Sequence, residues 1–153
     1  MIKNDLYFLK LAVNQAKKSV KLGGFPAGAV LVKHHQVIGR ASALGNKLND
    51  PTSHPEIALI RKTCKKLKTT DLSGCILYTS TESCLMCFMA DSWANIPRIV
   101  YACRRSQVSP AYYGSSTDIH EINKTLPRPI DLVFLPDLEP QVLKIIKDWE
   151  NKT

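Results

Sequence analysis

A short apolar run followed by two closely spaced cysteines decides the fold: Cys75-Ile76-Leu77-Tyr78-Thr79-Ser80-Thr81-Glu82-Ser83-Cys84-Leu85-Met86-Cys87. The apolar run, residues 75–79, predicts a buried strand. Residues 84–95 predict a helix that stops before Pro97. Cys84 and Cys87 open this helix and, being three residues apart, lie on one face of it.

The sequence on either side of this segment predicts helices and strands that largely alternate. Upstream, apolar spacings of three and four predict a helix over residues 6–20, and Gly23-Gly24 ends it. A strand hairpin over 27–32 and 37–39 and a helix over 57–67 come next. Downstream, strands are expected at 98–102 and 131–135, with a short helix between them and a closing helix over 138–149. This order predicts an α/β fold with a mixed sheet and helices on both faces.

Length and composition narrow the class of protein. A chain of 153 residues fits one domain, residues 1–153. No apolar run approaches the roughly 18 residues of a membrane span, and Met1 to Asp5 lack a secretory core, so a cytoplasmic protein without membrane contact is expected. Five cysteines are too few, and odd in number, for a disulfide scaffold. The net charge of +8 permits an anionic partner such as RNA without demonstrating one.

A second fragment, His54-Pro55-Glu56, opens the predicted helix before the apolar strand. One histidine and two cysteines provide three zinc ligands, the number typical of a catalytic zinc that keeps one position for water. Helix N-termini lower the pKa of cysteine, so Cys84 and Cys87 are expected to bind metal as thiolates. Glu56 is then left as a carboxylate beside the metal, able to transfer protons.

Each fragment also has a simpler explanation. Ser53 and Glu56 have the spacing of a capping box, in which Glu56 only seals the helix end. Cys84 and Cys87 alone are also compatible with a redox pair or with core packing. A zinc module without catalysis is a further alternative. His34, His35 and His120 have no such neighbours in sequence and are expected on the surface or in loops.

In combination, the H-x-E and C-x-x-C fragments resemble the cytidine deaminase superfamily of zinc-dependent nucleobase and nucleoside deaminases. The resemblance extends over about residues 5–102. Residues 50–56, 60–62 and 75–80 are most similar to bacterial guanine deaminases, and bacterial tRNA adenosine deaminases come next.

The resemblance implies a three-layer α/β/α fold of the cytidine deaminase type with a five-stranded mixed sheet. It implies that His54, Cys84 and Cys87 hold Zn²⁺ and that Glu56 shuttles a proton while ammonia leaves the base. It further implies substrate contacts from four residues of the pocket, namely Phe25, Ala27, Ala29 and Asn46. The assembly it implies is a homodimer.

Three positions depart from the pattern of these relatives. Ser83 replaces the usual proline before the first cysteine, and serine is a favoured N-cap, so the helix and its zinc ligands are expected to survive. Pro55 inside H-x-E is tolerated in the first helical turn. Pro26-Ala27-Gly28-Ala29 lacks the aromatic residue that many relatives carry at position 27, which predicts a larger pocket or a lost stacking surface.

The substrate expected from these features is a small purine base or nucleoside, with guanine first. The alternative is a tRNA-specific adenosine deaminase. Lysines at 62, 65, 66 and 68 and the pair Arg104-Arg105 are compatible with RNA, but a lysine-rich helix face is usually just solvated. Residues 103–130 match neither group of relatives; they are expected to form either a cover over the pocket or an ordinary loop.

Overall fold

The computed structural model describes residues 5–153, so the expectation drawn from the first four residues lies outside the described part of the chain. No helix within that part is long and apolar enough to cross a membrane. The helices are α1 (Asp5–Lys21), α2 (Gly45–Leu48), α3 (Pro55–Leu67), α4 (Leu85–Trp93), α5 (Ile119–Thr125) and α6 (Glu139–Glu150). The strands are β1 (Gly28–Lys33), β2 (Gln36–Ser42), β3 (Cys75–Thr79), β4 (Arg98–Tyr101) and β5 (Asp131–Phe134).

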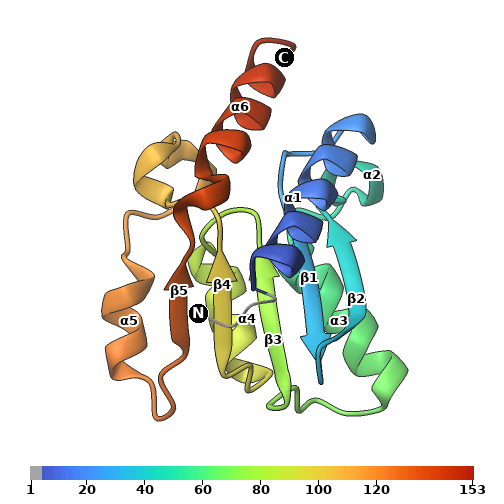
Figure 1. Cartoon of the computed structure of the whole chain (residues 1–153), viewed down its shortest axis with the longest axis vertical. Helices are drawn as coiled ribbons and strands as arrows, with labels where there is room; N and C mark the ends of the chain where they lie inside the picture. The colour runs from blue at the N-terminus through green and yellow to red at the C-terminus, as the bar shows by residue number, and fades with distance from the viewer. Residues whose placement is uncertain (1–4) are drawn as a thin grey trace.

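The five strands form one mixed sheet in the order β2-β1-β3-β4-β5 (Figure 1). β1 pairs antiparallel with β2 and with β3, whereas β3, β4 and β5 run parallel to one another. The hairpin turn between β1 and β2 places His34 and His35 at positive φ, 50° and 59°. The five-stranded mixed sheet predicted from the sequence is therefore confirmed.

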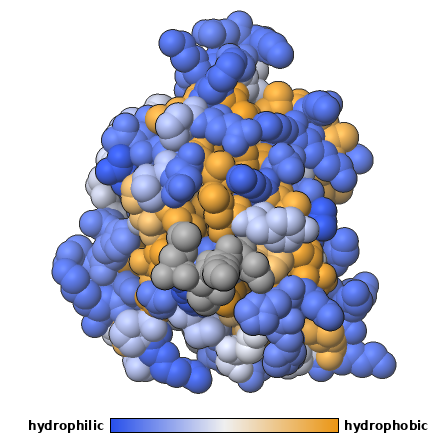
Figure 2. Space-filling view, in the orientation of Figure 1, coloured by the Kyte–Doolittle hydropathy of each residue, from blue (hydrophilic) through white to orange (hydrophobic). Residues whose placement is uncertain are grey.

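Helices cover both faces of the sheet, which confirms the predicted three layers. α1 and α6 lie on one face and bury Phe8, Leu9 and Val142 among others. α3, α4 and α5 lie on the other and bury Leu59, Phe88 and Ile119 among others. In Figure 2, hydrophobic side chains show in the middle of the α1 and α6 face and hydrophilic residues surround them.

Gly28 lets α1 approach the sheet closely. A Cβ atom at this position would lie 2.4 Å from the backbone oxygen of Ala12 and 2.4 Å from the backbone nitrogen of Ala16. Any side chain here would push α1 away from β1. Since β1 leads out of the loop that carries Phe25 and Ala27, this close contact also fixes one wall of the site described below.

Most predicted elements occur within a few residues of their expected bounds, and the differences are local. The predicted second strand is longer in the structure, Gln36–Ser42, because its pairing with β1 continues to Ser42. The short helix α2 and the single 3₁₀ turns at Arg105–Gln107 and Pro110–Tyr112 were not predicted. These are single turns in polar segments, too short to give a periodic pattern.

An ion pair fastens α6 to the end of β4. The Arg104 guanidinium donates to the Glu139 carboxylate at 3.1 and 2.9 Å, and the backbone N–H of Arg104 donates to it at 3.1 Å. The Arg104 side chain, through its hydrogen bonds, holds the pKa of Glu139 below the usual value of 4.5.

This ion pair predicts a loss of stability in acid. A carboxylate whose pKa is depressed in the folded state stabilises the fold above its unfolded pKa, and that contribution disappears as pH falls through the folded pKa. We expect urea midpoints of the wild type to fall between pH 6 and pH 3, and those of Glu139→Gln to fall less. Equal losses in both proteins would contradict the prediction.

Candidate metal centre and active site

His54 is placed by the start of α3. It is the N-cap residue, with extended backbone (φ −66°, ψ 157°), and Pro55 occupies the first helical position as expected. A capping box would require Ser53 as the N-cap, but His54 holds that place and no side chain caps the helix. The capping-box interpretation of Glu56 is therefore wrong, and the buried Glu56 carboxyl is free for another role.

Cys84 and Cys87 are placed by the start of α4 in the same way. Cys84 is the N-cap residue and Cys87 is the third residue of the helix. The expectation that Ser83 caps this helix is wrong: no side chain caps it, and the buried Ser83 hydroxyl has no hydrogen-bond partner among residues 5–153. The helix forms without this cap, and the two sulfur atoms remain available at its N-terminus.

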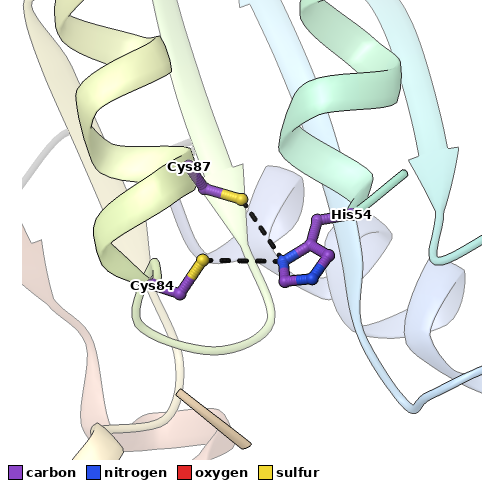
Figure 3. Close-up of side chains that lie close together, drawn as sticks. All are labelled: His54, Cys84 and Cys87. Carbon is purple, nitrogen blue, oxygen red and sulfur yellow. Dashed lines mark hydrogen bonds between the residues drawn. The ribbon is translucent and has the colours of Figure 1, made fainter. Parts of the chain in front are cut away.

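The structure brings His54, Cys84 and Cys87 together from two helices that begin at the same end of the sheet (Figure 3). Their ligand atoms all lie within 4.8 Å of one another. The Nδ1 atom of His54 lies 3.5 Å from the sulfur of Cys84 and 3.5 Å from that of Cys87. Ligands of a tetrahedral zinc, at bond lengths of 2.3 Å to sulfur and 2.0–2.1 Å to nitrogen, would be about 3.6 Å apart. Both separations fit a zinc ion.

The chemistry of this group also suits a zinc site that keeps a position for water. Across the described residues the group has three members and no fourth protein ligand. The pKa of Cys84 is lowered to about 4, chiefly by a hydrogen bond from the Cys87 side chain. Burial, and after it the negative charge of Cys84, raise the pKa of the Glu56 carboxyl. Glu56 lines the same pocket as His54 and Cys84.

A pocket opens over this group. Its volume is about 250 Å³, and His54, Glu56 and Cys84 lie in its wall. Most of the remaining wall consists of aromatic and aliphatic side chains, among them those of Phe25, Val108, Tyr112, Tyr113 and Ile146. Such a mixture of apolar walls and few polar groups is typical of a site for a small, flat organic molecule.

The four predicted substrate contacts lie in different places. Phe25 and Ala27 line the pocket as expected. Ala29 is fully buried in the core on the α3 and α4 side of the sheet, so it supports the sheet rather than the pocket wall. The side-chain amide of Asn46 donates to the backbone oxygen of Gly23 at 3.1 Å, and Asn46 lines a neighbouring groove that shares Phe25 and His54 with the pocket.

An aromatic cluster lies at the wall of the pocket, and sequence reasoning found it only in part. The ring centroid of Phe25 lies 5.0 Å from that of Tyr112 and 5.3 Å from that of Trp149, both edge to face. Tyr112 also hydrogen-bonds Glu150 on α6. Tyr112 and Tyr113, from the segment 103–130 that was expected to form either a cover or an ordinary loop, line the pocket, and Tyr112 also packs against the core. No pattern in the sequence indicated that Trp149 contributes to this cluster, because its contribution depends on how α6 packs.

Comparison with known sequences identifies the same region. The family model for the cytidine and deoxycytidylate deaminase zinc-binding region matches residues 2–103. A guanine deaminase of Bacillus subtilis is 42% identical over 122 residues, which cover 79% of this chain and 78% of that protein. A tRNA-specific adenosine deaminase of Aquifex aeolicus is 38% identical over 96 residues, covering 63% of this chain and 64% of that protein. The match to the Aquifex protein thus spans a little under two thirds of its length.

Solved structures give the same two kinds of neighbour. A structure from a study of tRNA:A34 deaminases that edit A to I at the wobble position has a TM-score of 0.77 and 30% identity, covering 92% of this chain and 99% of that one. The X-ray structure of guanine deaminase from Bacillus subtilis has a TM-score of 0.66 and 36% identity, covering 95% and 92%. Both likenesses extend well beyond residue 103.

Proposed function

Because the chain belongs to the zinc-binding family of cytidine and deoxycytidylate deaminases, we propose that it hydrolyses the exocyclic amine of a purine base or nucleoside, with guanine as the first candidate. As a member of this family it is a zinc-dependent hydrolytic deaminase, which confirms the family and zinc expectations. We assign zinc binding to His54, Cys84 and Cys87, and proton transfer to Glu56. The pocket wall then orients the ring.

The proposed reaction converts the amine-bearing carbon of the base into a carbonyl and releases ammonia. A zinc ion held by the three ligands would supply Lewis-acid activation of water at neutral pH. Glu56 accepts the proton that the attacking water loses and returns it to the leaving amine nitrogen. The raised pKa of the buried Glu56 carboxyl suits both halves of this transfer. Apolar walls around the site exclude competing water.

The observation that carries a small-molecule substrate is the aromatic cluster. Phe25, Tyr112 and Trp149 come from three distant segments and pack edge to face beside the pocket. This arrangement suits a base or nucleoside better than an extended nucleic acid, which requires an open path to the metal. The volume of the pocket, about 250 Å³, is also that of a small ligand.

Similarity to a guanine deaminase supports guanine as the first candidate. Identity with the Bacillus guanine deaminase is 42% over 122 residues. The second candidate, tRNA deamination, is favoured by the higher TM-score of the tRNA deaminase structure, 0.77 against 0.66. The exposed Arg61, Lys62 and Lys65 of α3 would offer phosphate contacts to such a substrate.

A panel of substrates tests both candidates. Zinc-loaded protein is incubated with guanine, adenine, cytosine and their nucleosides, and ammonia release is measured. An anticodon stem-loop with adenosine at the wobble position is assayed in parallel for inosine. Turnover of guanine supports the proposal. Inosine formation in the stem-loop, with no turnover of any free base or nucleoside, would establish the second candidate instead.

Phe25→Ala tests the proposed role of the aromatic wall. Stacking of a base on an aromatic ring contributes about 1–3 kcal/mol, so we expect KM to rise by roughly 5- to 150-fold. Tyr7→Ala is the matched control, because it removes a ring that is 59% exposed and lies outside the pocket. An unchanged KM in Phe25→Ala would contradict the assignment of Phe25 as a stacking surface.

We propose further that the chain acts as a single catalytic domain in a homodimer. The homodimer is supported by the exposed side of α4, where two large apolar side chains face outward: Met86 is 38% exposed and Trp93 is 83% exposed. A helix that is apolar all round is usually covered on every side. Light scattering after size-exclusion chromatography tests this assembly, and a monomeric mass at micromolar concentration would refute it.

A further inference from the structure

A second group of possible metal ligands lies outside the zinc site. Glu82 lies in the loop between β3 and α4, Asp118 is the N-cap of α5, and His120 is in the first turn of α5. One ligand atom of each lies within 4.8 Å of the other two. His120 was expected on the surface or in a loop; its side chain is 43% exposed, but it lies in the first turn of α5 rather than in a loop. Glu82 is distant in sequence and reaches it only through the fold.

The side chain of Glu82 is largely buried at the pocket wall, and one of its oxygens, which keeps a little exposure, has no hydrogen-bond partner among the described residues. The side chain is 5% exposed. Its Oε2 atom accepts the backbone N–H of Arg105 at 3.0 Å. Its Oε1 atom accepts no hydrogen bond within residues 5–153 and lies 3.9 Å from Nε2 of His120. Burying a carboxylate is costly unless a cation or several hydrogen bonds compensate for it.

The nearby arginines do not supply that cation. Arg104 forms its ion pair with Glu139. The Arg105 guanidinium donates to the backbone oxygens of Ser115 and Thr117 and lies over the Tyr113 ring. In the described part of the chain, His120 is the basic group within 4.0 Å of Glu82, and that distance is too long for a hydrogen bond.

We propose that Glu82, Asp118 and His120 bind a second divalent transition-metal ion, such as zinc or manganese. Two carboxylates and an imidazole form a hard, sulfur-free ligand set that suits these ions. Nitrogen and oxygen ligands at about 2.1 Å from a tetrahedral ion would be about 3.4 Å apart, so the 3.9 Å gap needs to close by about half an ångström. In the structure, Nε2 of His120 lies 3.3 Å from the Tyr101 hydroxyl. In the proposed site, Nε2 binds the ion instead.

The location gives this ion a structural role. Glu82 lines the substrate pocket, and Asp118 ends the segment that carries Tyr112 and Tyr113. The Tyr113 hydroxyl already donates to the backbone oxygen of Glu82 at 2.9 Å. A metal ion between Glu82 and the start of α5 therefore fastens the segment that carries Tyr112 and Tyr113 to Glu82 in the wall of the pocket. This role does not depend on which base the enzyme deaminates.

Titration of metal-free protein with Co²⁺ tests the proposal, because thiolate ligands give cobalt a charge-transfer absorption that carboxylates and imidazole do not. The wild type is expected to bind two equivalents, of which one produces this absorption. His120→Gln is expected to bind one equivalent with the absorption intact. Asp118→Ser, which keeps a capping side chain for α5, is expected to behave like His120→Gln.

Two further variants make the result decisive. Glu121→Gln removes a neighbouring exposed carboxylate from the same helix and should still bind two equivalents. Cys84→Ser combined with Cys87→Ser should bind one equivalent without the charge-transfer absorption. Saturation of the wild type at one equivalent would overturn the proposal, as would two equivalents in His120→Gln.

Discussion

Glu56→Gln is expected to lower kcat for the deamination by two to four orders of magnitude while the protein keeps its zinc. The change preserves the size of the side chain but removes the group that accepts and returns a proton, and such groups contribute about 10²- to 10⁴-fold. The side chain is buried and lines the pocket together with His54 and Cys84. The buried carboxyl of Asp91, which interacts electrostatically with Glu56, does not line the pocket and is not expected to take over its role. Steady-state kinetics and zinc analysis on the same preparation measure both quantities.

Glu121→Gln is the matched control, because it makes the same chemical change on the exposed surface of α5. Its kcat should equal that of the wild type. If Glu56→Gln kept most of its activity and lost only about 1 kcal/mol of stability, Glu56 would be a structural residue and another group would transfer the proton. Loss of zinc in Glu56→Gln would instead make Glu56 part of the metal site.

Asp5→Ala is expected to cost about 3–5 kcal/mol of unfolding free energy, because it leaves a buried charge without its partner. The Asp5 carboxylate is fully buried and accepts hydrogen bonds from the Tyr78 hydroxyl at 2.7 Å and from the Arg98 guanidinium at 3.2 and 2.9 Å. The Arg98 side chain is 18% exposed and would keep only the exposed Asp131 as a partner. Urea denaturation monitored by circular dichroism measures the loss.

Asp137→Ala is the control for this prediction, since Asp137 is an exposed aspartate and its removal should change stability by no more than about 0.5 kcal/mol. Asp5→Asn, which keeps the shape but not the charge, should fall between the two. A loss below about 1 kcal/mol in Asp5→Ala would mean that Arg98 and Tyr78 find other partners. The network joins α1 to β3, β4 and β5, so its loss should also reduce the cooperativity of unfolding.

The centre of the site was predictable from the sequence because its residues depend on local structure. His54, Cys84 and Cys87 each lie at a helix start, and the order of strands and helices brings the two helix starts to one end of the sheet. The sequence therefore contained both the ligand types and their placement. The family model, the structural neighbours and the five-stranded sheet confirm the family and the fold.

The walls of the site were harder to predict because they depend on contacts between distant segments. Ala29 follows Ala27 closely in sequence, yet Ala29 lies in the core and Ala27 in the pocket wall. Ala27 belongs to the loop before β1, whereas Ala29 lies within the strand and packs under α3 and α4. Trp149 contributes only because α6 lies over the face of the sheet near Phe25. Glu82 and His120 meet for the same reason, and no periodic pattern signals such a meeting.

The contact of Trp149 with Phe25 and Tyr112 has a practical consequence for work with this enzyme. The indole of Trp149, in the last turn of α6, packs against the Phe25 and Tyr112 rings, and both of these rings line the pocket. A fusion or truncation that disturbs the last turn of α6 would therefore also shift the pocket wall. Kinetic constants should be measured on protein in which α6 is left intact.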